Sequence, residues 1–351
     1  MIPVVDHILG RFSQDLGVDL GTVNTLVYAK GKGIVIREPS IVAQHKKTKK
    51  ILAIGTEAKK MLGKTPASII CVRPMKEGVI SDYDTTLSML SHFVRKIHKK
   101  PGGGFSLPRP RIIIGVPTNV TEVERRALLD VAIASGAREA YLVEEPMAAA
   151  IGANLPVAEP VGSMIVDIGG GTCEIAVISL WGIVCGRSLK IGGDVMDSDI
   201  TSYVRSRWGL ALGEKTAEDL KITLGSAYIQ DAEREMVVRG LDLEKGLPRS
   251  IKLTTSHIRE SLSPSLNTIV YAIRDVIHDA PPDLVSDIAE RGIVICGGGA
   301  LIPGIHKLIS QETKMPVTIA QEPLFCVARG CAALLLSDGL LEKVKIAKTT
   351  G

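Results

Sequence analysis

Two aspartates stand where an apolar run meets a glycine-containing turn. Asp167 follows residues 164–166 (MIV) and precedes residues 169–172 (GGGT), and Asp19 occupies the same place in a second copy of the pattern, residues 16–28. Glycines leave no Cβ to block a ligand, so backbone N–H groups in such a turn can close on an anion. A carboxylate beside the turn can hold, through water, the Mg²⁺ that accompanies a phosphate. These residue types therefore favour binding of a polyphosphate with its metal.

One copy of the pattern would also fit an ordinary hairpin, because glycine turns close many hairpins. The two copies, at Asp19 and Asp167, indicate two related domains. Each domain would offer one phosphate-binding hairpin to a shared cleft.

Two further features could serve the same ligand. Glu145 follows the strand expected over residues 139–143, and the carboxyl ends of strands are where open α/β sheets keep their ligands. A carboxylate at a helix start is also favoured by the helix dipole alone, so this residue has a structural alternative. Residues 297–299 (GGG) follow a buried strand and precede a helix expected over residues 305–311, an arrangement that can accept an anion or the flat face of a base.

The elements expected around these residues alternate between strand and helix. Residues 111–117 are typical of a buried strand, and Thr121 with Glu124 forms a capping box that opens a helix ended by Gly136. Residues 139–143 then form the next strand, which makes an α/β arrangement.

In the second half, a helix is expected over residues 216–226 with Thr216 as its N-cap. A long helix is expected over residues 255–277, and Pro264 must bend or restart it. The Lys-rich C-terminal residues are expected to fray.

The composition is that of an ordinary folded protein, with hydrophobic residues at 45% and charged residues at 23%. The length allows about two domains. The net charge of +4 gives no case for nucleic acid as a partner, which would need a clustered basic face. Six cysteines without a CxxC pair indicate small core residues, not a zinc site or a disulfide framework. No apolar run approaches the ~18 residues of a membrane span and no signal peptide is recognised, so a cytoplasmic protein is expected.

Two segments carry apolar side chains that could meet a membrane. Residues 1–12 place apolar residues at helical spacing, which fits either a helix packed on the domain or one lying on a membrane surface. Phe105 and Leu107 lie on the glycine- and proline-rich loop 101–108, and they either tuck back onto the domain or insert into a bilayer.

The order of these motifs resembles the actin, sugar-kinase and chaperone ATPase superfamily, and within it the MreB family of bacterial actins. The matching sequences are DLGTVNT (19–25), KGKGIV (30–35), RPMKEGVI (73–80), EPMAAAIG (145–152), DIGGGT (167–172), TAE (216–218) and GGGA (297–300). The resemblance implies an α/β protein with an actin-like ATPase fold. Two related domains would each carry a small α/β insert, with nucleotide in the cleft between them.

The same resemblance implies four parts. Residues 1–33, 76–150 and 325–351 would form the first core domain, with residues 34–75 as its insert. Residues 151–186 and 250–324 would form the second core domain, with residues 187–249 as its insert.

Carried over position by position, the resemblance implies ATP and Mg²⁺ as cofactors. Glu145 would orient the water that attacks the γ-phosphate, and Asp19 and Asp167 would serve the Mg²⁺. The nucleotide-binding positions would be Thr22, Val23 and Asn24 in the first phosphate turn, Gly169, Gly170 and Gly171 in the second, Glu218 and Lys221 toward the ribose and adenine with Asp219 and Leu220 between them, and Gly297, Gly298, Gly299 and Ala300 beside the base.

The chain departs from the family pattern at four places. These are Val23 for the usual Ala, Cys173 for a second Thr, residues 117–119 (PTN) for Pro-Ser-Gly, and residues 302–303 (IP) for a Leu-Arg pair. None removes a metal-facing residue, so ATP binding is expected to survive. Pro303 could alter the base-side loop, and with it nucleotide preference or exchange.

The resemblance implies a filament-forming ATPase at the inner face of the cytoplasmic membrane, which organises cell-wall growth and rod shape. Its partners would be further copies of itself, the membrane and membrane-bound cell-elongation proteins, and slow ATP hydrolysis would bias filament turnover. The alternative is a metabolic kinase of the same superfamily with a sugar pocket in the cleft. A DnaK-type chaperone ATPase would need a peptide-binding domain beyond the ATPase. A Rossmann dehydrogenase is least expected, because no GxGxxG opens a βαβ unit.

Overall fold

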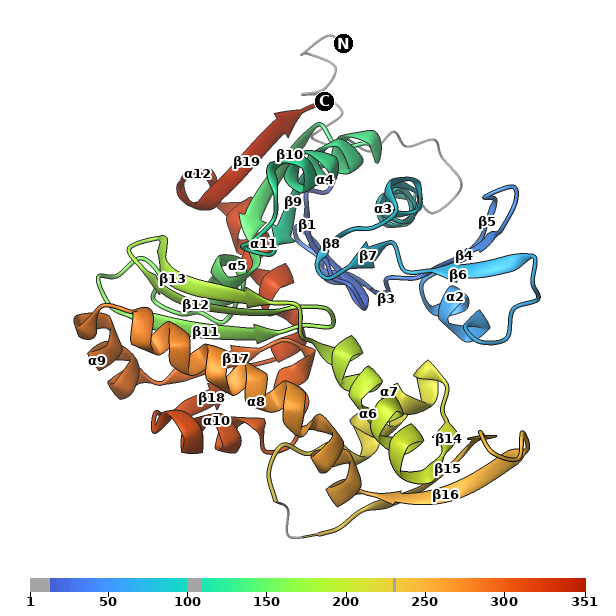
Figure 1. Ribbon diagram of the computed structural model, residues 1–351. Helices are drawn as coiled ribbons and strands as arrows, with labels where there is room; N and C mark the ends of the chain where they lie inside the picture. Colours follow the sequence, from blue (N-terminus) through green and yellow to red (C-terminus); the bar gives the residue numbers. More distant parts are fainter. Residues whose placement is uncertain (1–12, 100–108, 230–231) are drawn as a thin grey trace. The chain divides into compact units, whose positions relative to one another are not determined.

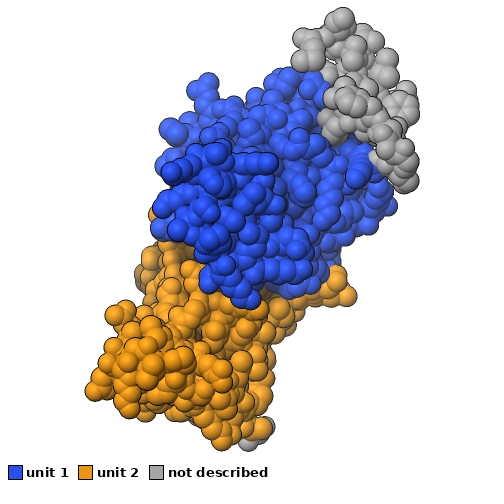
Figure 2. Space-filling model, turned by 90° about the vertical axis from the view of Figure 1, so that its right-hand side faces the viewer, with its two compact units in different colours: residues 1–160, 178–183, 324–351 blue, residues 161–177, 184–323 orange. Residues whose placement is uncertain are grey.

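The computed structural model describes residues 13–99, 109–229 and 232–351, and Figure 1 shows the elements along the chain. The chain divides into two compact units, coloured separately in Figure 2. The first comprises Met1–Pro160, Ile178–Ile183 and Leu324–Gly351, and the second comprises Val161–Val177 and Val184–Pro323. The finer division into four parts stays a prediction.

The two segments predicted to meet a membrane, residues 1–12 and the loop with Phe105 and Leu107, lie outside the described residues. Across the residues that the structure does describe, every helix is too short or too polar to span a bilayer.

The first unit is built on a six-stranded mixed sheet in the order β19-β10-β9-β1-β2-β3. Its strands are β1 (Leu16–Leu20), β2 (Asn24–Ala29), β3 (Gly33–Pro39), β9 (Arg111–Val116), β10 (Glu139–Glu144) and β19 (Lys345–Thr350). β1, β9 and β10 run parallel to one another, and the other neighbours pair antiparallel. The carboxyl ends of three adjacent strands therefore meet at one edge of this sheet.

The helices of the first unit cover this sheet, and a small sheet follows β3 along the chain. The helices are α3 (Tyr83–His98), α4 (Glu122–Ala134), α5 (Glu145–Gly152), α11 (Cys326–Leu336) and α12 (Asp338–Val344). The small sheet has the order β5-β4-β6, and its elements are β4 (Val42–His45), β5 (Ile51–Ile54), α2 (Thr56–Met61) and β6 (Ile69–Val72). A short hairpin, β7 (Met75–Lys76) with β8 (Val79–Ile80), leads into α3.

The C-terminal residues do not fray, so that expectation is wrong. β19 pairs antiparallel with β10 and covers the edge of the sheet. The Lys348 ammonium lies 5.0 Å from the centroid of the Tyr141 ring on β10. Fraying would exchange these ladder hydrogen bonds and this cation–π contact for water, which is why the segment is ordered.

A five-stranded sheet in the order β13-β12-β11-β17-β18 belongs to the second unit except for residues 178–183 of its β12–β13 hairpin, which are counted with the first. Its strands are β11 (Ser163–Ile168), β12 (Cys173–Ser179), β13 (Gly182–Leu189), β17 (Ile293–Cys296) and β18 (Val317–Ile319). The helices are α6 (Gly193–Trp208), α7 (Glu214–Leu224), α8 (Thr255–Asp279), α9 (Pro282–Arg291), the 3₁₀ turn η1 (Gly298–Leu301) and α10 (Ile305–Thr313). A separate sheet contains β14 (Leu210–Ala211), β15 (Glu235–Asp242) and β16 (Pro248–Thr254).

Helix starts follow capping chemistry, with one correction. The Thr121 side chain accepts the N–H of Glu124, and the Glu124 carboxylate in turn accepts the N–H of Thr121, so the predicted capping box is confirmed. Thr216, in contrast, is not an N-cap. α7 begins at Glu214 with Gly213 as its N-cap, because an acidic residue in the first turn suits the positive end of the helix dipole.

Pro264 lies inside α8, and the helix runs through it without restarting, contrary to one of the two expected outcomes. Proline removes a single N–H from the helix ladder. Leu262 and Leu266, on either side of Pro264, are buried in the same core, so both halves of the helix are held to it.

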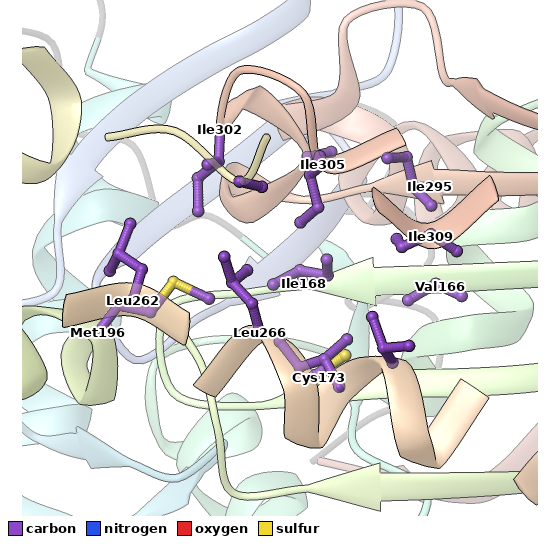
Figure 3. Close-up of a cluster of buried hydrophobic side chains, with 14 of the residues drawn as sticks. Val166, Ile168, Cys173, Met196, Leu262, Leu266, Ile295, Ile302, Ile305 and Ile309 are labelled. Atoms are coloured by element: carbon purple, nitrogen blue, oxygen red, sulfur yellow. The ribbon is translucent and has the colours of Figure 1, made fainter. Parts of the chain in front are cut away.

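The core of the second unit surrounds the strands that carry the second glycine turn. β11 is buried at all six positions. Figure 3 shows Ile168 at the end of β11 and Cys173 at the start of β12 beside Leu266 of α8. The turn between these two strands is therefore anchored on both sides. All six cysteines are free thiols, and four of them are buried.

In the first unit, α5 and α11 pack through two glycines. A Cβ placed on Gly330 of α11 would lie 1.8 Å from the carbonyl oxygen of Ala148, and one on Gly152 of α5 would lie 1.9 Å from that of Cys326. The backbones of the two helices are thus in direct contact. This contact fixes the position of α5, whose first residue is Glu145.

We expect Gly330→Ala to lower the free energy of unfolding by about 3 kcal/mol, since overpacking of this kind costs about 1–3 kcal/mol and the clash is with backbone. Urea-induced unfolding measures the change. The matched control is Gly339→Ala in α12, where an added Cβ meets nothing within 4 Å and should stabilise by up to about 1 kcal/mol. Equal stabilities of the two variants would contradict the packing argument.

Candidate functional site

The predicted site residues Asp19 and Glu145 of the first unit lie at the carboxyl ends of two parallel strands on either side of β9. In the sheet register Asp19 of β1 lies opposite Gly115 of β9, and Gly115 lies opposite Val143 of β10. Glu145 follows β10 directly and begins α5. Asp19 and Glu145 thus flank the strand that carries Gly115, at the carboxyl edge where open α/β sheets place ligands.

Gly115 makes room between these two carboxylates. A Cβ at this position would lie 3.4 Å from Cγ of Glu145 and 2.7 Å from Cγ1 of Val327. The buried Cys331 thiol lies beneath them. Burial raises the pKa of Cys331, and the negative charges of Asp19 and Glu145 raise it further, which places both carboxylates near the same thiol. The structure therefore brings Asp19 and Glu145 together.

Hydrogen bonds from other segments of the first unit hold the turn between β1 and β2, which was predicted to bind phosphate. The Ser40 hydroxyl donates to the carbonyl of Gly21 at 2.6 Å, and the Ser40 N–H donates to the carbonyl of Val23 at 2.8 Å. The hydroxyl of Thr22 accepts the N–H of Gly78 at 3.1 Å. Ser40 was not predicted as a site residue. The only sequence feature that marks it is its position directly after Pro39, where a strand is interrupted.

Asn24 begins β2 with its side chain exposed, whereas Thr22 is buried. Of the two polar side chains predicted in the first turn, Asn24 is therefore the one open to a ligand in solution. The hydroxyl of Thr22 is already used to fix the hairpin of β7 and β8.

The second unit repeats the arrangement at Asp167. In the register Asp167 of β11 lies opposite Cys296 of β17, immediately before the third glycine turn. Asp167 is 8% exposed. Burial and, to a lesser extent, the charge of Glu174 raise the pKa of Asp167 to about 7, although a hydrogen bond from the Cys296 thiol acts to lower it.

These surroundings fit a magnesium ion. A buried carboxylate beside a second carboxylate is unfavourable as an anion unless a cation offsets the charge. In the described parts of the chain, no group of three or more His, Cys, Asp or Glu side chains is arranged to hold a metal. Mg²⁺ commonly takes only one or two protein carboxylates and completes its shell with phosphate oxygens and water. Asp167 is the carboxylate of this unit that would hold such an ion, and the metal roles of Asp19 and Asp167 stay predictions.

Glu174 was not singled out from the sequence. It is 1% exposed on β12, and it accepts a hydrogen bond of 2.5 Å from the Ser188 hydroxyl on β13. A charged residue within an apolar strand is rarely fully buried unless it is paired, so its position in residues 173–178 (CEIAVI) was the available signal.

The second glycine turn is held at its carbonyl groups. The N–H of Gly169 donates to the carbonyl of Thr172 at 2.8 Å and closes the turn. The N–H groups of Gly193 and Asp194, in the first turn of α6, donate to the carbonyls of Gly169 and Gly170 at 3.1 and 2.9 Å. The helix N-terminus therefore holds the turn, and does not itself face an anion through these two groups.

The third glycine turn packs directly on the end of β11. Gly297 has φ +78°, and a Cβ there would lie 2.3 Å from Oδ1 of Asp167. A Cβ on Gly299 would lie 2.2 Å from Cγ2 of Ile168. The turn continues into η1, with Ala300 buried, and α10 begins only at Ile305. The helix expected after the third glycine turn therefore begins at Ile305 as predicted, and the 3₁₀ turn η1 lies between the two.

The four predicted residues of α7 divide into two kinds. Leu220 is fully buried in the core, so its side chain has a packing role. Glu218, Asp219 and Lys221 are partly exposed. The Lys221 ammonium donates to the carbonyl of Gly193 at 2.7 Å, which links α7 to the helix that holds the second glycine turn. The nucleotide contacts of all four stay predictions.

Comparison with known proteins identifies the family. A model of the MreB/Mbl protein family matches residues 13–342. The cell shape-determining protein MreB of Escherichia coli is 51% identical over 325 residues, which cover 92% of this chain and 93% of that protein. The cell shape-determining protein Mbl of Bacillus subtilis is 45% identical over 95% of this chain and 99% of its own length. The chain belongs to the MreB/Mbl family.

Solved structures agree with this assignment. MreB5 of Spiroplasma citri bound to ADP matches with a TM-score of 0.86 at 38% identity, covering 92% of this chain and 96% of that one. The chain of a MamK double helical filament matches with a TM-score of 0.78 at 22% identity, which supports the fold alone. The predicted family and the actin-like fold are both confirmed.

We expect Gly297→Ala to weaken Mg·ATP binding by at least about tenfold, or about 1.4 kcal/mol, because its Cβ would displace the Asp167 carboxylate. Titration with a fluorescent ATP analogue measures the dissociation constant. The control is Gly246→Ala, which has a similar positive φ of +67° but meets nothing within 4 Å of its Cβ. Equal affinities of the two variants would show that the contact with Asp167 does not matter.

Proposed function

We propose that this protein is an ATP-binding bacterial actin that polymerises into filaments and maintains cell shape. The observation that carries the proposal is the repeated arrangement of a strand-end aspartate beside a glycine turn, Asp19 in one unit and Asp167 in the other. Relatives at 45–51% identity over most of the chain are cell shape-determining proteins. Each of the two turns would bind phosphate oxygens of a nucleotide through its backbone N–H groups.

ATP is the proposed nucleotide. The MreB5 structures of Spiroplasma citri were solved with ADP and with AMPPNP, and the match to both supports an adenine nucleotide in this chain. A bound Mg²⁺ would neutralise charge on the transferred phosphoryl group. Asp19 and Asp167 would orient it, and the amides of the glycine turns would bind phosphate oxygens.

Glu145 is the proposed catalytic residue. Its position at the end of β10 and beside Asp19 is suited to holding a water molecule near the metal-bound phosphate. Phosphoryl transfer needs mainly positioning and stabilisation of charge, so one water-orienting carboxylate can suffice. We further propose that hydrolysis is slow and coupled to polymerisation.

Membrane association is part of the proposal and rests on the sequence. Residues 1–12 and the pair Phe105 and Leu107 would bind the inner face of the cytoplasmic membrane. Membrane-bound cell-elongation proteins are the proposed further partners. The metabolic-kinase alternative is not favoured, because the curated relatives reported above determine cell shape.

Sedimentation tests the filament and membrane parts together. The protein is pelleted with Mg·ATP, with and without anionic liposomes, alongside the double variant Phe105→Ser/Leu107→Ser. We expect the wild type to sediment as filaments and the variant to lose only its binding to liposomes. A protein that stays in the supernatant with every nucleotide and at every concentration would refute the filament proposal, and sugars would then be screened for ATP-dependent phosphorylation.

Glu145→Gln tests the catalytic assignment. We expect ATP hydrolysis to fall at least about 10²-fold, the usual scale for loss of a residue that handles the attacking water, with ATP affinity nearly unchanged. Phosphate release in single-turnover conditions measures the rate. The matched control is Glu139→Gln at the opposite end of β10, where the carboxylate accepts a hydrogen bond from Tyr141. Unchanged hydrolysis in Glu145→Gln would move the catalytic role to another residue.

A further inference from the structure

A largely buried ion pair lies beside the second glycine turn of the second unit. Nζ of Lys221 on α7 is 2.8 Å from Oδ1 of Asp197 on α6. The two side chains are only 15% and 18% exposed. Asp197 was not among the predicted site residues. Because its side chain is largely buried, it is not an ordinary surface charge.

The pair is connected to the turn through the backbone. Nζ of Lys221 also donates to the carbonyl of Gly193 at 2.7 Å. The N–H of the same Gly193 donates to the carbonyl of Gly169, the first glycine of the turn. Two hydrogen bonds in series therefore join the Lys221 ammonium to the proposed phosphate-binding turn.

The start of α6 is in close contact with the second glycine turn. A Cβ on Gly192 would lie 2.5 Å from the carbonyl oxygen of Gly170 and 2.8 Å from that of Gly169. A Cβ on Gly193 would lie 3.0 Å from Nζ of Lys221. A shift of the first turn of α6 would be passed directly to the turn.

Asp197 fixes where the ammonium of Lys221 lies. The Lys221 ammonium donates a hydrogen bond to the carbonyl of Gly193 and forms an ion pair with Oδ1 of Asp197 at 2.8 Å. Burial raises the pKa of Asp197 to about 6, and the charge of Lys221 opposes that rise. Removal of one member of a buried pair leaves the other charge uncompensated, so Lys221 would turn toward water if Asp197 were neutral.

We propose that Asp197 is a positioning residue for nucleotide binding, which acts through Lys221 and the start of α6 to hold the second glycine turn in its anion-binding form. The inference rests on the proposed ATP-binding function. It assigns Asp197 no contact with the nucleotide.

The experiment is a double-mutant cycle read by the dissociation constant for Mg·ATP. The variants are Asp197→Asn, Lys221→Met and the two combined. We expect Asp197→Asn to weaken ATP binding about tenfold in the wild-type background, and by less than about twofold when Lys221 is already Met, because its effect passes through that residue. Equal losses in both backgrounds, or no loss in the wild-type background, would overturn the proposal.

The control is Asp275→Asn on α8, which removes a carboxylate 2.7 Å from Arg187 in the same unit and should leave ATP affinity unchanged. Thermal unfolding without nucleotide separates positioning from general stability: a lower melting temperature with unchanged affinity would assign Asp197 a purely structural role and overturn the proposal. If Asp197→Asn does not fold, Lys221→Met is compared with the combined variant, in which neither charge remains. A further loss of ATP affinity in the combined variant would show that Asp197 does not act through Lys221, and would refute the proposal. Failure of the wild-type protein to bind ATP would instead refute the proposed function.

Discussion

The structure depends on keeping carboxylates at the ends of buried strands. Asp167 is 8% exposed and lies near Glu174, which is 1% exposed, so both are removed from the water that would stabilise their charge. An unpaired charge in such a place is costly, and the pKa of Asp167 rises to about 7 in response. A hydrogen bond from the Cys296 thiol to Asp167 and one from the Ser188 hydroxyl to Glu174 offset part of this unfavourable free energy. A metal ion with its phosphate ligand would complete the compensation, which supports the proposed nucleotide site at this strand end.

Backbone atoms of neighbouring glycines pack directly against the same strand end and the second glycine turn. A Cβ added to Gly297 would lie 2.4 Å from the carbonyl oxygen of Ile168 at the end of β11, and one added to Gly192 would lie 2.5 Å from that of Gly170 in the second turn. Contacts between backbones are set by covalent geometry and hydrogen bonds, which vary less than rotamers do. The turns are therefore held rigidly, and a rigid binding turn loses less entropy when it closes on an anion.

Local chemistry was predictable from the sequence, and long-range partners were not. The capping box of Thr121 and the strand-turn-strand motif at Asp167 each depend on residues close together in the sequence, and both are present in the structure as predicted. The ordered C-terminal strand was missed because its pairing with β10 outweighs the tendency of a chain end to fray. The start of α7 at Glu214 was missed because the prediction used Thr216 as the N-cap and overlooked the acidic first turn. The pairs Glu174 with Ser188 and Asp197 with Lys221 join different elements. No periodicity or spacing in one sequence marks such partners.

Two of the four departures from the family pattern, Cys173 and Pro303, lie where burial or a backbone hydrogen bond makes the contact. Cys173 is fully buried, and burial raises the pKa of its thiol, so it stays protonated and packs as a small apolar group. A hydroxyl in its place would need a hydrogen-bond partner when buried, whereas the thiol does not. Pro303 lacks an N–H, but its carbonyl accepts the N–H of Ala227 at 2.8 Å, so the link from the third glycine turn to the segment after α7 does not require the missing donor. Both substitutions are therefore compatible with the arrangement of Asp167 and its neighbouring turns, because that arrangement rests on carboxylates and backbone groups that this chain retains.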